Sequence, residues 1–388
     1  MKNLEKRVPI IRFKGFSEAW EQRKVGNFLS ESKIKGSDGS TAKKLTVKLW
    51  RKGIISKEEI YKGSSATQYY IRSVGQFMYG KLDFLNQAFG ILPNGLDGYE
   101  STLDSPAFDF KSGIDSNFFL EYVCLEMFYK YQGNIANGTR KAKRIHVDTF
   151  FDMAVTIPKL EEQQKIGSFF KQLDNTIALH QRKLDALKRV KKGLLQQMFA
   201  NNEEKAPRLR FINFDEEWEQ RKLNEIANRY DNLRVPITAS ARISGTTPYY
   251  GANGIQDYVE GFTHDGEFIL VAEDGANNVK NYPVQHVNGK IWVNNHAHVL
   301  QAKENKHDNK FLMNAIKIIR FEPFLVGGGR AKLNSDVMMK LIVKFPCYEE
   351  QKKIGTFLQR LENVITLHKN KINKLSSLKK TYLQNMLI

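Results

Sequence analysis

Several stretches of the chain resemble catalytic or metal-binding motifs, but each lacks a group that the chemistry requires. The stretch GQFMYGKL, Gly75–Leu82, imitates a phosphate-binding loop, yet Leu82 stands where a hydroxyl should bind Mg²⁺. Residues Thr247–Tyr250, TPYY, match only part of the Asn/Asp-Pro-Pro-Tyr motif of amino-group DNA methyltransferases. His296 and His298 have no neighbouring carboxylate or thiol cluster in the sequence, which argues against zinc. The sequence therefore predicts no catalytic residue, no metal site and no nuclease cluster, and indicates a chain that binds and positions.

Polar and basic residues in two loop-rich segments instead suit contacts with nucleic acid. Asn, Gln and Arg match the donors and acceptors of base edges in the major groove, and Lys and Arg neutralise phosphates. In the second segment the expected base contacts are Arg242, Tyr250, Asn253, Asn277 and Asn278, and the expected phosphate contacts are Lys280, Arg330 and Lys332. In the first segment the candidates are Lys62, Thr67, Gln68, Asn86 and Gln87, with a basic cluster of Arg140, Lys141, Lys143 and Arg144. Asn and Gln in turns also serve purely structural roles, so both interpretations stay open.

The composition agrees with a polyanionic partner. Sixty Lys and Arg against 42 Asp and Glu give the 388 residues a formal net charge of +18 and a pI near 9.6. A hydrophobic content of 41% supports globular cores and excludes a mainly disordered chain, and no apolar run is long enough to span a bilayer. Because no apolar signal core follows the N-terminus, we expect a reducing cytoplasm, with Cys124 and Cys347 as buried apolar residues.

The chain contains two internal repeats. Residues 9–24, PIIRFKGFSEAWEQRK, match residues 207–222, PRLRFINFDEEWEQRK, at 10 of 16 positions. Residues 157–199 align without gaps on residues 345–387, with 20 identities in 43 positions. The segments between these repeats are diverged and align only at their ends. This order indicates a duplicated chain in which two diverged modules alternate with two similar long segments.

Both long segments are predicted to be helices with a coiled-coil seam, because apolar residues recur at alternating steps of four and three. His180 and His368, with Lys191 and Lys379, take seam positions where an apolar residue is expected, and we interpret them as residues that specify register and partner. Residues 160–199 and 349–388 together carry a net charge of +9, half of the total. The first seam comprises Ile166, Phe170, Leu173, Ile177, His180, Leu184 and Leu187, and the second Ile354, Leu358, Leu361, Ile365, His368, Ile372 and Leu375.

Helix starts and strand patterns complete the predicted organisation. Pro158 and Pro346 precede Glu-Glu-Gln, whose acids suit the positive end of a helix dipole; a partner-binding role for these acids stays an alternative. Alternating aromatic and β-branched residues predict strands and hairpins in the modules, with one helix near 118–131 and its counterpart near 309–320. The fold class is therefore α+β. We expect a first module over 1–156, a first helix over 157–200, a second module over 201–344 and a second helix over 345–388.

Together these motifs resemble the specificity subunit of type I restriction–modification systems. The resemblance spans essentially the whole chain and rests on the RFxxFxxxWEQRK leaders, the PxxEEQxKIG helix starts, the heptad helices and the stretch PYYGANGIQDYV, Pro248–Val259. It implies two target-recognition domains that each read one half of a bipartite, asymmetric DNA site. It also implies that the two helices pack as an antiparallel coiled coil with pseudo-two-fold symmetry and act as a spacer.

The resemblance further implies partner subunits that carry the chemistry. Two methyltransferase subunits would dock on the helices and transfer a methyl group from S-adenosylmethionine to adenine N6, and motor–nuclease subunits would use ATP and Mg²⁺. The chain itself would bind no cofactor. Because recognition modules vary by design, the resemblance transfers no base-contact residue. The residues also leave two alternatives: a single-chain nuclease or methyltransferase, and a coiled-coil interaction protein whose basic face is only solvated.

Overall fold

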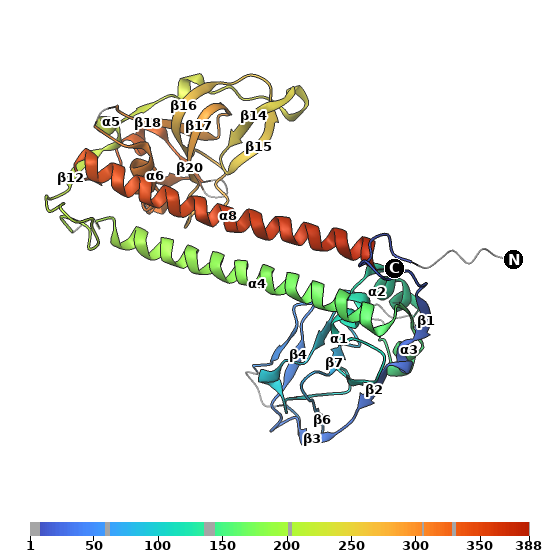
Figure 1. The fold of residues 1–388 in the computed structure, drawn as a ribbon. Helices are drawn as coiled ribbons and strands as arrows, with labels where there is room; N and C mark the ends of the chain where they lie inside the picture. Colours follow the sequence, from blue (N-terminus) through green and yellow to red (C-terminus); the bar gives the residue numbers. More distant parts are fainter. Residues whose placement is uncertain are drawn as a thin grey trace. The chain divides into compact units, whose positions relative to one another are not determined.

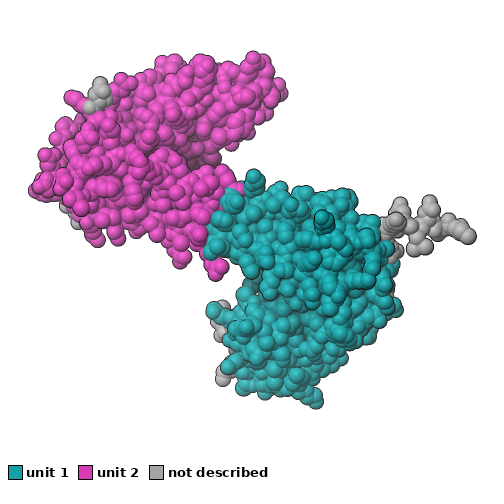
Figure 2. Space-filling view, viewed as in Figure 1, with its two compact units in different colours: residues 1–180, 371–388 teal, residues 181–370 magenta. Residues whose placement is uncertain are grey.

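The computed structural model describes residues 8–58, 63–135, 144–200, 204–304, 306–327 and 331–387, and the chain divides into two compact units. Unit 1 comprises residues 1–180 and 371–388, and unit 2 comprises residues 181–370 (Figure 2). The long helices α4 (Leu160–Gln197) and α8 (Tyr348–Met386) both cross this division. Each unit therefore contains one module, the first part of the helix that follows it and the last part of the other helix (Figure 1).

Unit 1 builds its module from short strands around an aromatic core. Its sheets have the strand orders β2-β10-β7-β8 and β3-β6-β9, with the pairs β1-β11 and β4-β5. The helix expected near 118–131 is broken in two at Cys124 and Leu125. The strands are β1 (Glu21–Lys24), β2 (Leu29–Ser32), β3 (Lys35–Asp38), β4 (Leu45–Val47), β5 (Ile54–Ser56), β6 (Gln68–Ile71), β7 (Phe77–Tyr79), β8 (Phe89–Ile91), β9 (Glu100–Ser101), β10 (Ala107–Phe110) and β11 (Ala154–Ile157), and the helices are α1 (Ser116–Val123), α2 (Glu126–Ile135) and α3 (Val147–Asp152).

Unit 2 has a different sheet. Six strands lie in the order β13-β18-β16-β17-β14-β15, with β14 and β17 parallel and the other neighbours antiparallel, and the pairs β12-β21 and β19-β20 stand apart. The mixed helix and sheet content of both units confirms the predicted α+β class. The elements are β12 (Glu219–Lys222), α5 (Leu223–Ile226), β13 (Ala227–Arg229), β14 (Ser244–Gly251), β15 (Gly254–Val259), β16 (His264–Ala272), β17 (Val284–Val293), β18 (Ala297–Ala302), α6 (Asn309–Lys317), β19 (Leu325–Val326), β20 (Lys332–Leu333), α7 (Ser335–Met339) and β21 (Ile342–Phe345).

The repeated leader is a strand that pairs with the strand before each long helix. Its EQRK end forms β1 in unit 1 and β12 in unit 2, which pair antiparallel with β11 and β21. The preceding tryptophan is buried in both units, Trp20 edge-on to Phe118 of α1 and Trp218 edge-on to Phe311 of α6. The leader thus closes each module on the start of its own helix.

A buried ion pair fixes the leader to the helix. Arg12 donates two hydrogen bonds to the Glu162 carboxylate, at 2.9 and 2.6 Å, and Arg210 donates two to Glu350, at 2.9 and 2.7 Å. Both glutamates are almost fully buried. The Glu-Glu-Gln motif therefore does more than begin a helix, because its second glutamate binds the leader arginine, which is distant in sequence.

The glutamine of the same motif fixes the helix to the module. The Gln163 side-chain oxygen accepts from the Asp115 N–H, and Gln351 accepts from the Asp308 N–H, at 2.9 and 3.1 Å. Asp115 and Asp308 in turn cap α1 and α6 through their side chains. Four residues further along the long helices, Gly167 and Gly355 allow this close approach, since an added Cβ would lie under 3 Å from the capping aspartate.

Within each unit the two helix segments lie side by side and run in opposite directions (Figure 1). Every residue of the two predicted seams is buried or half-buried, whereas most flanking positions are exposed. The seam lysines form ion pairs at equivalent places. Lys379 donates to Asp174 at 2.6 Å in unit 1, and Lys191 contacts Glu362 in unit 2. Residues of the modules interact with both pairs. In unit 1 Lys379 also contacts Glu121, which binds Arg51, and in unit 2 Lys317 lies close enough to Lys191 and Glu362 to interact with their charges.

The end of each long helix enters the core of the module in its unit. Met386 and Leu387 join the aromatic core of unit 1, and Met198 and Phe199 join the core of unit 2.

The two cysteines differ in exposure. Cys347, expected to be buried, is exposed, because it lies in the short segment before α8. Cys124 is half-buried beside the Arg51 ion pair, and burial raises the pKa of its thiol to about 12. Across the described ranges, no helix has the length and hydropathy needed to cross a membrane.

Gly167 and Gly355 should be required for the junction. An alanine at either position would place Cβ 2.7 or 2.8 Å from the backbone nitrogen of Phe118 or Phe311, so we expect Gly167→Ala and Gly355→Ala each to lower the free energy of unfolding by about 1–3 kcal/mol. Gly193→Ala in α4 is the matched control, because nothing lies within 4 Å of its added Cβ, and helix propensity should stabilise it by about 0.5–1 kcal/mol. Urea unfolding of the three variants measures this. Equal effects at all three positions would contradict the close-approach role.

Candidate DNA interface

Two loops of unit 2 bring several predicted DNA contacts together. The Asn253 side chain, in the turn between β14 and β15, donates to the Gly275 carbonyl and accepts from the Asn277 N–H, both at 2.9 Å. Asn278 accepts from the Asn281 N–H, which shapes the loop between β16 and β17. Asn253, Asn277, Asn278 and Lys280 are all exposed. The two loops thus form one polar surface, on which Asn253 and Asn278 each bond a loop backbone through their side chains and Asn277 and Lys280 are exposed.

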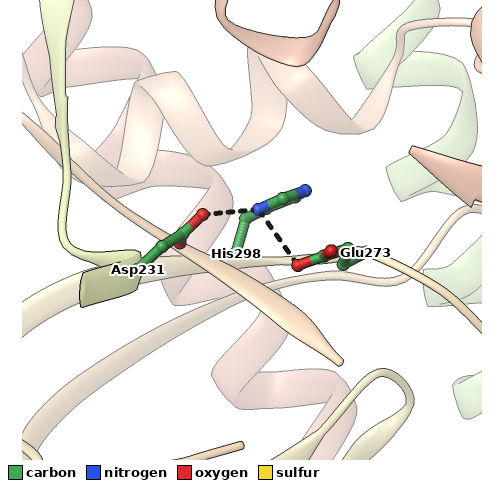
Figure 3. A group of neighbouring side chains, drawn as sticks. All are labelled: Asp231, Glu273 and His298. Carbon is green, nitrogen blue, oxygen red and sulfur yellow. Dashed lines mark hydrogen bonds and ion pairs between the residues drawn. The ribbon is translucent and has the colours of Figure 1, made fainter. Parts of the chain in front are cut away.

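A network of charged side chains lies at the start of the loop between β16 and β17, where His298 contacts both Asp231 and Glu273 (Figure 3). Glu273, at the end of β16, accepts from Arg234 at 2.7 Å and from Lys332 at 3.0 Å. Asp231 accepts from the His298 Nδ1 at 2.7 Å and from the Val299 N–H at 2.8 Å. The residues lie in or directly after the η4 turn (Asp231–Leu233), β16, β18 and β20, so the network joins segments up to 101 residues apart in sequence. Lys332, a predicted phosphate contact, is thereby tied to Glu273.

The His298 ring lies between two oxygen atoms of other elements. Its Nε2 lies 2.9 Å from the Leu333 carbonyl and its Nδ1 lies 2.7 Å from Asp231. The imidazole therefore links the η4 turn to β20. Contrary to expectation, both His296 and His298 have carboxylate neighbours: Asp274 lies 2.5 Å from His296, and Asp231 contacts His298. Both carboxylates come from other elements of the fold.

Asp231, Glu273 and His298 include the ligand types of a metal site, and each of them also contacts other protein groups. Burial alone would raise the pKa of Asp231, but the contacts with His298, the Val299 N–H and Arg234 together outweigh burial and lower it. Burial opposes ionisation of Glu273 as well, and the bonds from Arg234 and Lys332 lower its pKa. The group therefore works as an ionised structural network that fixes the loop between β16 and β17.

The other predicted contacts of unit 2 are more enclosed. The Arg242 guanidinium lies over the Tyr249 ring, 4.2 Å from its centroid, and donates to Asp257 at 3.3 Å. Tyr250 is half-buried on β14, and burial raises its pKa. Beside them the hairpin β14–β15 exposes Ile255 and Tyr258, which sequence analysis did not select. Both residues lie in β15, and their sequence pattern does not distinguish a ligand-binding hairpin from any other hairpin.

In unit 1 the predicted contacts are distributed over two regions. The Gln68 side chain donates to the Gly36 and Ser37 carbonyls, so it holds β6 against β3. Nearby, Arg72 is fully buried and burial lowers its pKa to about 10. Thr67 precedes β6 and is half-buried. This region therefore has a polar surface at Thr67 and Gln68, with the buried Arg72 directly after β6.

The remaining candidates of unit 1 lie elsewhere. Asn86 and Gln87 accept backbone bonds from Trp50 and Arg51, so they lie beside the ion pairs of the helix seam rather than near Gln68. Arg144 pairs with Asp104 at 3.2 Å on the surface. Lys62, Arg140, Lys141, Lys143 and Arg330 lie outside the described residues.

Removing one carboxylate should loosen the loop network. Glu273→Gln removes the carboxylate that binds both Arg234 and Lys332, and we expect it to lower the free energy of unfolding at pH 7 by about 1–3 kcal/mol. Because the folded pKa of Glu273 lies below its ordinary 4.5, the stabilisation is complete above that pH and is lost as the pH falls through the folded pKa. The difference from the parent chain should therefore shrink in acid. Urea unfolding between pH 7 and pH 3 measures it, with the exposed Glu260→Gln as control; a pH-independent difference would contradict the ionised network.

Comparison with known proteins identifies the family. A family model described as "Type I restriction modification DNA specificity domain" matches residues 108–189 and 215–377. A type I restriction enzyme specificity subunit of Haemophilus influenzae is 46% identical over 145 residues, 37% of each chain, and the MjaVIII specificity subunit of Methanocaldococcus jannaschii is 22% identical over 280 residues, 63% of each chain. The matched stretches thus span less than two thirds of these relatives.

A solved structure shares the fold over nearly the whole chain. The type I restriction–modification S subunit of M. genitalium has a TM-score of 0.71 and 13% identity, covering 98% of this chain and 99% of that one. This likeness supports the architecture of two modules and two long helices. The family match covers more than half of the sequence and takes in parts of both modules and both helices. The chain belongs to the type I restriction–modification DNA specificity family.

Proposed function

We propose that the chain is the sequence-specific DNA-recognition subunit of a type I restriction–modification complex in the cytoplasm, and that each module reads one half of a bipartite site. The observation that carries the proposal is the contrast between the repeated junctions and the different modules that they support. The junction of leader, helix start and capping aspartate is repeated residue for residue, whereas the sheets and loops of the two modules differ. A repeated junction that carries two modules with different loops suits a protein that reads two different half-sites.

The proposal assigns the chemistry to partner subunits. The sequence has no complete catalytic motif, and the loop surface of unit 2 offers amides and a lysine, which suit base edges and phosphates. Methyltransferase subunits would bind S-adenosylmethionine and methylate adenine at N6, and motor–nuclease subunits would use ATP and Mg²⁺. The specificity subunit would select the adenines by placing its partners on the site.

The long helices would set the spacer between the two half-sites. Each helix rises about 1.5 Å per residue, so one added heptad lengthens it by about 10 Å, which corresponds to about three base pairs at roughly 3.4 Å each. A heptad also preserves the seam, because the apolar pattern repeats every seven residues.

A heptad inserted after Arg182 and another after Asn370, equivalent positions of the repeat, should lengthen the spacer of the methylated site by about three base pairs. A four-residue insertion near Lys188 shifts the seam and should change the spacing or abolish methylation. Mapping methylated adenines in cells that carry the chain and its methyltransferase subunits gives both results. Unchanged half-sites with unchanged spacing would contradict the spacer role, and methylation by the chain alone would contradict the non-catalytic assignment.

Exposed apolar residues on the helices would bind the methyltransferase subunits. In unit 1, Leu179 and Leu378 are 45% and 41% exposed, and in unit 2, Val190 and Leu367 are 53% and 67% exposed. The four form two equivalent pairs of the repeat, Leu179 with Leu367 and Val190 with Leu378. None is a seam residue, so the pairing of α4 with α8 does not explain them. Equivalent apolar positions in both helices suit two copies of one partner.

Leu179→Glu combined with Leu367→Glu should reduce co-purification of the methyltransferase subunits at least tenfold, because each change places a charge in an apolar contact. Asn175→Glu combined with Asn363→Glu is the matched control, since these exposed residues are also equivalent in the repeat and receive the same charge. Gel filtration of the co-expressed proteins measures the complex. Equal loss in both double variants would contradict the assigned contact.

A further inference from the structure

A groove of about 1070 Å³ opens in unit 2 between the end of α4, β21, α6 and α7. Its walls include the buried Trp218 and Ala315. At its rim Ile318, Phe324 and Ile342 are 44%, 37% and 59% exposed, which is unusual for large apolar side chains gathered at one hollow. The repeated architecture of the chain allows a direct comparison with the equivalent place in unit 1.

In unit 1 this place is occupied by a helix. The Gln132 side chain of α2 donates to the Ala154 carbonyl and accepts from the Ala154 N–H, both at 2.8 Å, which satisfies the outer edge of β11. Phe128 and Tyr129 of α2 are buried, and Phe128 packs edge-on against Tyr122. An amide-bearing helix thus covers both the strand edge and the apolar surface beside it.

Unit 2 has the same strand edge without the covering helix. Ile342 of β21 occupies the position of Ala154 in β11. Ala315 of α6 occupies the position of Tyr122 in α1, and because it has no aromatic ring the groove of unit 2 is deeper. Leu223 donates to the Leu341 carbonyl, which means that the N–H and carbonyl of Ile342 point away from β12. Within the described part of the chain, no group is bonded to this outer edge of Ile342.

The groove also differs from its counterpart in charge. Arg208 and Lys340 line it, and the equivalent residues of unit 1 are Ile10 and Asp152. Arg208 pairs with Glu204, whereas Lys340 has no ion-pair partner among the residues that the structure describes. Basic residues therefore appear in the unit whose groove is open, and they favour an acidic occupant.

We propose that this groove binds an acidic amphipathic helix of a partner protein, in the place that α2 takes in unit 1. The apolar side of the helix would cover Ile318 and Phe324, a side-chain amide would bond the edge of Ile342, and carboxylates would face Lys340 and Arg320. An apolar hollow of this size favours a helix over a DNA backbone, because phosphates gain nothing from contact with isoleucine and phenylalanine.

A stapled helical peptide provides the probe. It carries Phe, Tyr and Gln at the spacing of Phe128, Tyr129 and Gln132, with glutamates at the positions that α2 exposes, and a fluorescein label reports binding to the full chain by polarisation. We expect saturable binding that Ala315→Tyr, which restores the ring of unit 1, and Lys340→Asp, which copies Asp152, each weaken at least tenfold. Lys369→Asp on α8 is the charge-matched control outside the groove and should leave binding unchanged.

Three results would overturn the proposal. Peptide binding that is absent, or indifferent to Ala315→Tyr and Lys340→Asp, would show that the groove is not the site. Loss of duplex DNA binding in Lys340→Asp, with DNA displacing the peptide, would make the surface a phosphate contact. A concentration-dependent dimer of the parent chain that Ala315→Tyr dissociates would identify a second copy as the occupant. Thermal unfolding midpoints of all variants, expected to match the parent chain, separate each result from misfolding.

Discussion

The buried ion pair between the leader arginine and the second glutamate of each long helix is the interaction on which the architecture depends. Glu162 and Glu350 are almost fully buried, and a carboxylate removed from water is tolerated only when its lone pairs are engaged. Arg12 and Arg210 supply two parallel hydrogen bonds each, the geometry in which arginine and carboxylate match best. Losing either partner would leave a buried charge, which costs about 3–5 kcal/mol. The pair therefore fixes where a module meets its helix.

Around this fixed point the two modules are free to differ. Unit 1 packs a core of phenylalanine and tyrosine rings under several small sheets, and unit 2 packs mainly aliphatic residues under a six-stranded sheet. Both cores nevertheless receive the end of the opposite helix, Met386 in one and Met198 in the other. Because each module contacts the helices both at the junction and through the helix end in its core, its loops can change without altering these contacts. The support of each module is thereby separate from its loop surface.

Polar residues in the helix seam show how the support is specified. Lys379 with Asp174 and Lys191 with Glu362 are equivalent pairs, yet the module adds Arg51 and Glu121 to the first and Lys317 to the second. Burial and the nearby Lys191 lower the pKa of Lys317. Ion pairs have directional geometry and a high cost of mispairing, so they favour one register where apolar contacts alone would tolerate several.

The sequence alone determined the duplication, the two long helices and their seams, because heptad spacing and repeated motifs are local patterns that survive without coordinates. It also indicated the α+β class and the family. Only the tertiary structure decided what the repeated motifs do. Arg12 lies 150 residues from Glu162, and Glu273 lies 25 residues from His298, so their partners carry no signal in spacing. The structure likewise showed that some predicted DNA contacts, such as Gln68, bond the protein's own backbone through their side chains. Loop side chains acquire their roles from neighbours that folding brings together, and those neighbours are distant in sequence.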